Sequence, residues 1–201
     1  MMTGVTPKTF ERLQMDAGVF LVNFDYSTAK NAAELAALVA AAIESDVGCL
    51  GATRGGGSFE CTPDTRTVEV DGMRYAFVGS TQNDTWTIKL KTTLLEVTPE
   101  NFAKALMCAD INKDGSVTTV RVRTSIEESD YIPSLCWVGD TARGLTLIKL
   151  DNALNLTGAS FTFADKGEGT LPVEFQAHQA SLEEQEYAPF EIVFFDEAAT
   201  E

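Results

Sequence analysis

The sequence predicts a mainly β protein in which two packed antiparallel sheets form a sandwich or barrel flanked by an α-helix. Two observations carry this prediction. Apolar and polar residues alternate in many short segments, and turn dipeptides such as Asp114-Gly115 and Lys166-Gly167 separate these segments. A chain of 201 residues is long enough to bury a sizeable core in one domain. We therefore expect a single domain over 1–201, with an N-terminal arm over 1–18, a helical insertion over 27–46 and a packed helix over 98–109.

The first elements are a strand and a helix. Residues 19–24 are apolar except for Asn23 and predict the first strand. Alanine and leucine dominate residues 27–46, which predicts a helix that Asn31 or Thr28 can cap and Gly48 can close.

The stretch from Gly51 to Gly72 superficially matches a phosphate-binding loop. Such a loop needs a lysine followed by a helix, but Gly57 stands at the lysine position and the next residues alternate as strands do. The glycines therefore open a strand. We expect Gly55 and Gly56 to allow a sharp turn and a close approach of the backbone.

Two strand predictions follow the glycines. The dipeptide Asp71-Gly72 favours a hairpin that pairs residues 66–70 with 73–79. The longest predicted strand, 84–97, has roughly fourteen residues, about twice the usual length, which favours a strand that extends beyond the core of one subunit. The face expected to pack inward carries Trp86, Ile88, Leu90 and Leu94, and the face expected to be accessible carries Thr85, Thr87, Lys89, Lys91 and Thr93.

The second half of the chain begins with a helix. Thr98 is suited to the N-cap and Pro99 to the first helical position, and the helix is expected to bury Phe102 and Leu106. Alternation then predicts strands over 117–124, 135–139, 145–150, 160–164, 171–178 and 190–195.

Charge and cysteine content restrict the function classes. The formal net charge is −15 and the isoelectric point is near 4.4, so electrostatic binding to nucleic acid is not expected. The cysteines Cys49, Cys61, Cys108 and Cys136 have no CxxC spacing, which favours reduced thiols in a protein made in the cytosol. We expect no secretion signal, and the longest apolar run, 32–43, is too short for a membrane span.

The candidate sites for chemistry are weak. Asp110, Asn112 and Asp114 match the first half of a calcium loop, but Arg121 stands where a bidentate glutamate is needed, so we interpret these residues as a turn that follows the helix. His178 is the only histidine and no nucleophile motif is present, so we expect a structural histidine. We predict no enzyme activity, no catalytic or cofactor-binding residues and no metal site.

Several segments carry a family resemblance in the same order along nearly the whole chain. They are 10–21, 51–56, 68–72, 94–98, 130–132, 138–139, 151–154, 171–178 and 189–192. Together they resemble the major tail tube proteins of long-tailed, siphovirus-like bacteriophages, particularly those that infect Gram-positive hosts. The helical segment 27–46 departs from the family, which has a shorter connection there.

The resemblance implies a structural protein of the virion tail, assembled in the cytoplasm of the bacterial host. Six subunits of this family form a ring whose inner strands close into one barrel, and the rings stack into a hollow tube. Viral DNA passes through the lumen without specific binding, and the partners are further copies, the tape-measure protein and other tail proteins. The residues expected at assembly interfaces are Phe10, Leu13, Met15, Gly55, Gly56, Thr85, Thr87, Lys89 and Lys91. The alternatives are the inner tube of a contractile tail or tailocin and a calcium-binding β-sandwich module.

Overall fold

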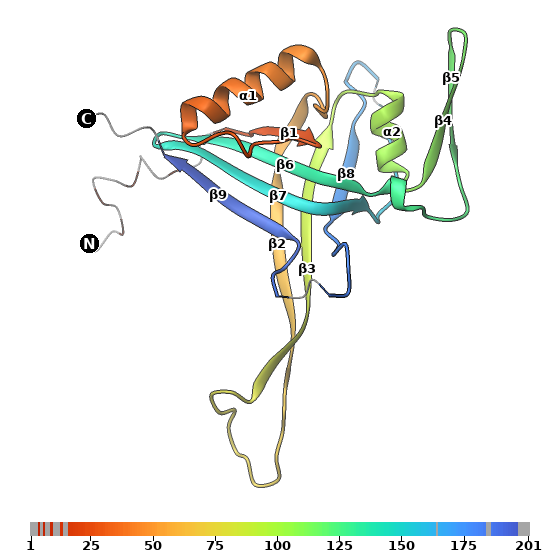
Figure 1. Cartoon of the computed structure of the whole chain (residues 1–201). Coiled ribbons are helices and arrows are strands. Elements are labelled where there is room, and N and C mark those ends of the chain that lie inside the picture. The colour runs from red at the N-terminus through yellow and green to blue at the C-terminus, as the bar shows by residue number, and fades with distance from the viewer. Residues whose placement is uncertain are drawn as a thin grey trace.

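A computed structural model describes Gly4, Thr6, Thr9, Leu13 and residues 16–163, 165–183 and 186–196 (Figure 1). In chain order its elements are β1 (Val19–Val22), α1 (Ala32–Ser45), β2 (Thr53–Thr67), β3 (Thr81–Leu94), α2 (Pro99–Ala105), β4 (Ala109–Asp114), β5 (Val117–Val122), β6 (Ile132–Thr141), β7 (Gly144–Asn155), β8 (Leu171–Gln176) and β9 (Phe190–Asp196). The mainly β prediction with two antiparallel sheets and two helices is confirmed.

The two sheets differ greatly in size. A seven-stranded sheet has the order β1-β6-β7-β8-β3-β2, with β9 also paired to β7, and β4 and β5 form a separate two-stranded sheet. The large sheet folds over itself at β7, where residues 144–150 pair with β9 but Leu154 and Asn155 pair with β8. Asn152, with a φ of 46°, lies in the left-handed region between these two parts. One sheet therefore supplies both layers of the main core.

The chain also covers the β1 edge of the large sheet. The N–H of Val22 donates to the carbonyl of Gly48 at 2.6 Å, and the N–H of Leu50 donates to the carbonyl of Phe20 at 3.1 Å. This segment leads directly into β2, the strand at the other end of the sheet order. The sheet is consequently close to a closed barrel, because residues 48–50, which lead into β2, lie beside β1.

Two hydrophobic clusters stabilise this arrangement. The first lies between the two layers of the large sheet and includes the buried side chains of Phe20, Leu90, Leu135, Leu150 and Phe175. The second lies between α1 and the other face of β1, β6, β7 and β9, and its buried members are Leu21, Ala32, Leu35, Cys136, Val138, Leu147 and Phe195. The helix α1 thus covers the face of the layer that is turned away from the main core (Figure 1).

The helix caps follow the sequence only in part. The side chain of Asn31 accepts from the N–H of Glu34 at 2.9 Å, as expected, but α1 ends at Asp46 in the left-handed region rather than at Gly48. Thr98 caps α2 through a 3.1 Å bond from the N–H of Asn101. The prediction of a helix over 98–109 is too long, because Met107 has a φ of 72° and ends the helical path before β4.

The hairpin predicted around Asp71-Gly72 is wrong. β2 pairs with β3 as far as Thr67 and Thr81, and residues 68–80 form the loop that joins the two strands. Within that loop the N–H of Met73 donates to the carbonyl of Val70 at 2.9 Å, so the dipeptide makes only a local turn. The predicted strand over 160–164 is also absent from the described residues, where Thr162 makes an isolated bridge to Thr170.

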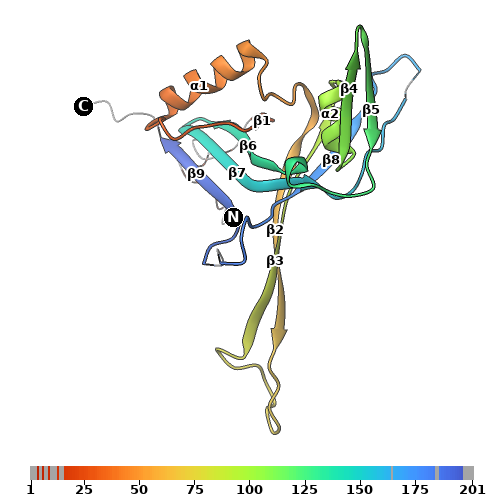
Figure 2. The same ribbon diagram turned by 45° about the vertical axis from the view of Figure 1, so that its right-hand side comes forward.

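The inward face of β3 is shorter than predicted. Ile88, Leu90 and Leu94 are at most 2% exposed, but Trp86 is 49% exposed, so its predicted place in the core is wrong. β2 and β3 leave the core between Trp86 and Ile88 and continue together as a projecting hairpin (Figures 1 and 2). The alternating pattern identifies the side of a strand but not the point at which its covering layer ends.

The point at which β3 leaves the core predicts different losses of folding stability for two substitutions on the same face of this strand. Leu90→Ala should reduce the free energy of unfolding by about 2–5 kcal/mol, because it leaves a cavity in the main core. Trp86→Ala should cost about 1 kcal/mol or less, because its ring is half exposed. Denaturant unfolding measures both, and equal losses would contradict the boundary.

Candidate assembly surfaces

The projecting part of the β2–β3 hairpin is exposed on both of its faces. All residues from 62 to 72 and from 81 to 86 are exposed, and a cross-strand contact from Arg66 Nε to Asp84 Oδ1 at 2.8 Å joins the strands. The hairpin ends in an apolar loop, which we call the tip (residues 68–80). In the tip the most exposed apolar side chains are Val70 at 65%, Tyr75 at 80%, Phe77 at 64% and Val78. A two-stranded ribbon gains little stability by itself in water. The projecting strands and the tip are therefore suited to contact with another chain.

The face of β2, β3 and β8 that is turned away from the main core is polar and carries a network of ion pairs. Lys89 Nζ lies 2.6 Å from Glu174 Oε1, and Lys91 Nζ lies 2.9 Å from Glu60 Oε1 and 3.3 Å from Glu174 Oε2. The hydrogen bond from Lys89 lowers the pKa of Glu174, and the hydrogen bond to Glu60 raises the pKa of Lys91. We call these four side chains the charge-paired face. Each of its lysines is matched by a carboxylate.

The glycines at 55–57 make both the sharp turn and the close backbone approach that the sequence predicts, but at different residues. Gly55 and Gly56 have φ values of +75° and +71°, and the pairing of β2 with β3 is shifted between Thr53 and Gly57. The close approach occurs at Gly57, where a Cβ would lie 2.5 Å from the carbonyl oxygen of Lys91 and 2.7 Å from the Phe20 ring. The close approach therefore lies one residue after Gly56, not at Gly55 or Gly56 as the sequence predicts.

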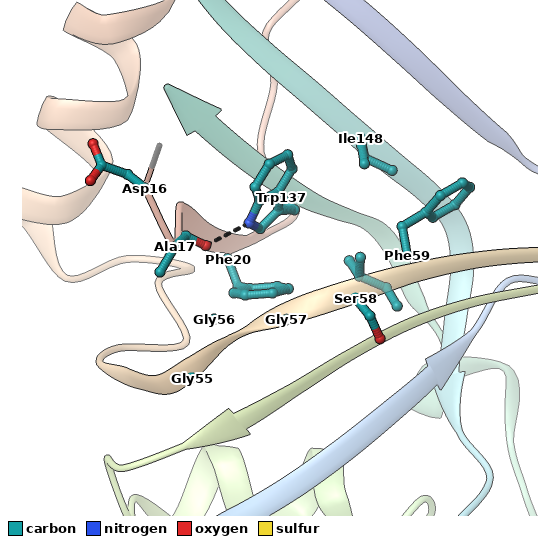
Figure 3. A pocket seen from close by; sticks show the side chains of 11 residues that line it. Asp16, Ala17, Phe20, Gly55, Gly56, Gly57, Ser58, Phe59, Trp137 and Ile148 are labelled. Carbon is teal, nitrogen blue, oxygen red and sulfur yellow. Dashed lines mark hydrogen bonds between the residues drawn. The ribbon is translucent and has the colours of Figure 1, made fainter. Parts of the chain in front are cut away.

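An apolar cavity of about 390 Å³ lies beside these glycines (Figure 3). Its walls come from both layers of the large sheet, and the lining residues are Asp16, Ala17, Phe20, Gly55, Gly56, Gly57, Ser58, Phe59, Leu90, Trp137 and Ile148. The indole N–H of Trp137 donates to the carbonyl of Ala17 at 2.9 Å, which satisfies the polar atom of the ring. The cavity therefore presents mainly aromatic and aliphatic surface.

β9 is an open edge of the sheet. It pairs with β7 along seven residues, and no described strand pairs with its other side. Ile192 and Phe194 on this strand are 42% and 74% exposed. An edge strand of this length with exposed apolar side chains favours pairing with another chain.

The calcium-loop residues do not converge on one point. Asp110 and Asn112 lie in β4, so their interpretation as a turn is wrong, whereas Asp114 leads into the β4–β5 turn. A strand rises about 3.4 Å per residue, which separates Asp110 from Asp114 by roughly 14 Å. Arg123 Nη1 lies 3.4 Å from Asp110 Oδ1, so this carboxylate belongs to an ion-pair group with Arg123. Within the described residues, no three His, Cys, Asp or Glu side chains are grouped to hold a metal ion.

The predicted interface residues are distributed over three places. Phe10 and Met15 lie outside the described residues, and Leu13 is 41% exposed. Thr85 is exposed on the projecting hairpin, while Thr87, Lys89 and Lys91 are half-buried on the polar side of β3.

The interface residues predicted from the sequence do not include Glu60, Glu174, Phe59 or Trp137, which lie at these surfaces. Glu174 could have been found, because alternation in the predicted strand 171–178 places it opposite the apolar residues Val173 and Phe175.

Comparison with protein-family models and with curated proteins finds no match to this sequence. In the part of the chain that the structure describes, neither α1 nor α2 has the length and apolar content that a membrane-spanning helix needs.

The close contact at Gly57 predicts a steric effect that the neighbouring glycines do not share. Gly57→Ala should destabilise the fold by about 1–3 kcal/mol, because the new methyl group meets backbone and a buried ring. Gly4→Ala is the control, since nothing lies within 4 Å of its Cβ position. Thermal and denaturant unfolding would measure both, and a Gly57→Ala protein as stable as the control would refute the close approach.

Proposed function

We propose that this protein is the subunit of a hollow phage tail tube, in which six copies close into a ring and rings stack along the tube axis. The observation that carries the proposal is the β2–β3 hairpin, whose strands continue past the core and end in the exposed apolar tip. A single copy leaves this surface in water, whereas an assembly of copies can bury it.

Contacts within the ring can use the open β9 edge. Strand pairing satisfies the unpaired backbone groups of an edge, and the exposed Ile192 and Phe194 provide apolar area at the same place. A ring of such pairings removes the open edge from every copy. In this arrangement α1 remains on the outer layer, where it covers the second hydrophobic cluster.

The charge-paired face is suited to line the channel. DNA phosphates bind proteins through cations that displace condensed counterions, and here Lys89 and Lys91 are already matched by Glu174 and Glu60. The net charge of −15 adds long-range repulsion of phosphate. DNA and a tape-measure protein would thus pass through the channel by shape and weak electrostatics, and the protein performs no chemical reaction. Its site of action is the virion tail, after assembly in the cytoplasm of the bacterial host.

Electron microscopy of negatively stained, concentrated protein tests the proposal. We expect six-fold rings or long hollow tubes, formed by the protein alone or after addition of a tail initiator complex. Persistent monomers in the presence of the initiator complex would overturn the proposed function.

The charge-paired face gives a second prediction. Glu174→Gln removes the carboxylate that contacts both lysines, so assembled protein should bind duplex DNA on the order of tenfold more tightly at low salt, and the gain should disappear as salt is raised.

The matched control is Glu44→Gln, which makes the same charge change on the exposed side of α1. Filter binding or fluorescence anisotropy measures both variants. Equal DNA affinities of the two variants would contradict the assignment of this face to the channel.

A further inference from the structure

The helix α1 is apolar on the side that faces solvent. Between Glu34 and Glu44 it contains only alanine, leucine, valine and isoleucine. A helix that is apolar all round is normally buried, whereas a helix at a protein surface places charged residues on its outer side. The members of this run with exposed side chains are Ala36, Ala37, Ala40, Ala41 and Ile43.

The described residues cover only one side of α1. Ala32 and Leu35 are buried against the strands beneath the helix, and Val39 and Ala42 are partly buried there. No described element lies over the opposite side in either view (Figures 1 and 2). At the end of the helix Ile43 is 47% exposed. The composition of α1 thus fits a helix with a second layer over it, and one copy of the chain does not supply that layer among its described residues.

An apolar groove of about 500 Å³ lies along one flank of α1. Its walls come from α1, from the segment that enters β1 and from the facing ends of β6 and β7. The aliphatic lining residues that keep exposed or half-buried side chains are Val19, Ala36, Val39, Ala40, Ile43 and Leu145. Alanine on the outer side allows a second helix to approach to the lower end of the roughly 8–10 Å range of axis separations, with its larger side chains in the groove. The shape therefore fits an amphipathic helix that lies along α1.

The charges around this groove favour a basic occupant. Glu44 lies in the last turn of α1, Asp46 is the C-cap residue, and that turn contains no basic residue. The C-terminal end of a helix has a partial negative charge, so a cation is stabilising there and a carboxylate is not. Asp140 adds an exposed carboxylate to the groove, whose described lining residues include no lysine or arginine. A positively charged side chain from another molecule would relieve this repulsion.

The same charges disfavour a second copy of the chain as the occupant. Two α1 helices packed on each other would bring Glu34, Glu44 and Asp46 of one copy close to the same three residues of the other. The net charge of −15 on each copy adds long-range repulsion. Charge complementarity thus requires a different, basic chain.

We propose that the exposed side of α1 and its flanking groove bind a basic amphipathic helix of a different protein. Apolar side chains of that helix enter the groove beside Ile43, and its lysine or arginine side chains face Glu44, Asp46 and Asp140. In the proposed tube this partner would bind on the exterior, where α1 lies. The inference goes beyond the tube function and does not depend on it, because the whole site lies within one copy.

A synthetic peptide tests the site with the full-length protein. The probe is a fluorescein-labelled peptide as long as α1, in which leucine and lysine recur with the helical period. Fluorescence anisotropy at physiological ionic strength should show saturable binding of this peptide. The same peptide with glutamate in place of lysine should not bind, because it meets carboxylates at the groove.

Two pairs of variants locate the binding. Ile43→Ser and Glu44→Lys should each weaken binding on the order of tenfold, because the first removes apolar contact area in the groove and the second reverses a charge beside it. The matched controls are Val117→Ser on the β4–β5 hairpin and Glu69→Lys on the tip, which make the same kinds of change at exposed positions elsewhere. Both controls should bind as the parent protein does, and circular dichroism verifies that all four variants are folded.

Three results would overturn the inference. They are absence of saturable binding, equal affinities within each pair of variants, and self-association of the protein that Ile43→Ser abolishes, which would assign the groove to a second copy. Tubes formed by a protein that does not bind the peptide would leave the tube function intact. Peptide binding at α1 by a protein that forms no rings or tubes with the initiator complex would overturn the tube function alone.

Discussion

The rest of the structure depends on the burial of one half of β3. Ile88, Leu90 and Leu94 pack against Phe20 and Phe175, and this contact joins the two layers of a sheet that is folded over itself. It is possible because β7 changes partners near its end, from β9 to β8, and because the chain before β2 lies against β1. A hydrophobic core between two layers of one sheet fixes the orientation of every strand in it.

Two surfaces follow from this orientation. Since side chains alternate along a strand, burial of Leu90 places Lys89 and Lys91 on the opposite side, where Glu60 and Glu174 of the neighbouring strands neutralise them. Since β2 and β3 are longer than the layer that covers them, their remaining residues project with the tip at the end. The proposed channel wall and the exposed tip are thus two consequences of the same long strands.

Local features of the fold could be predicted from the sequence, and features that depend on distant partners could not. The caps at Asn31 and Thr98 were predictable because a cap is made by residues three positions apart. The prediction for Trp86 is wrong because alternation does not show where the opposite layer ends. The sequence places Asp110 in a turn because residues 110–115 resemble a calcium loop, whereas pairing with Arg121 makes Asp110 part of a strand. The cavity at Trp137 and the carboxylates around Lys91 required the pairing of strands that lie far apart in the sequence.

The most direct measurement of the central claim is a cryo-electron microscopy reconstruction of the assembled protein. We expect a hollow tube of stacked six-fold rings in which the charge-paired face of β2, β3 and β8 lines the channel and α1 lies on the exterior. A closed particle without a channel, or a tube with α1 on its inner wall, would contradict the proposed tube architecture.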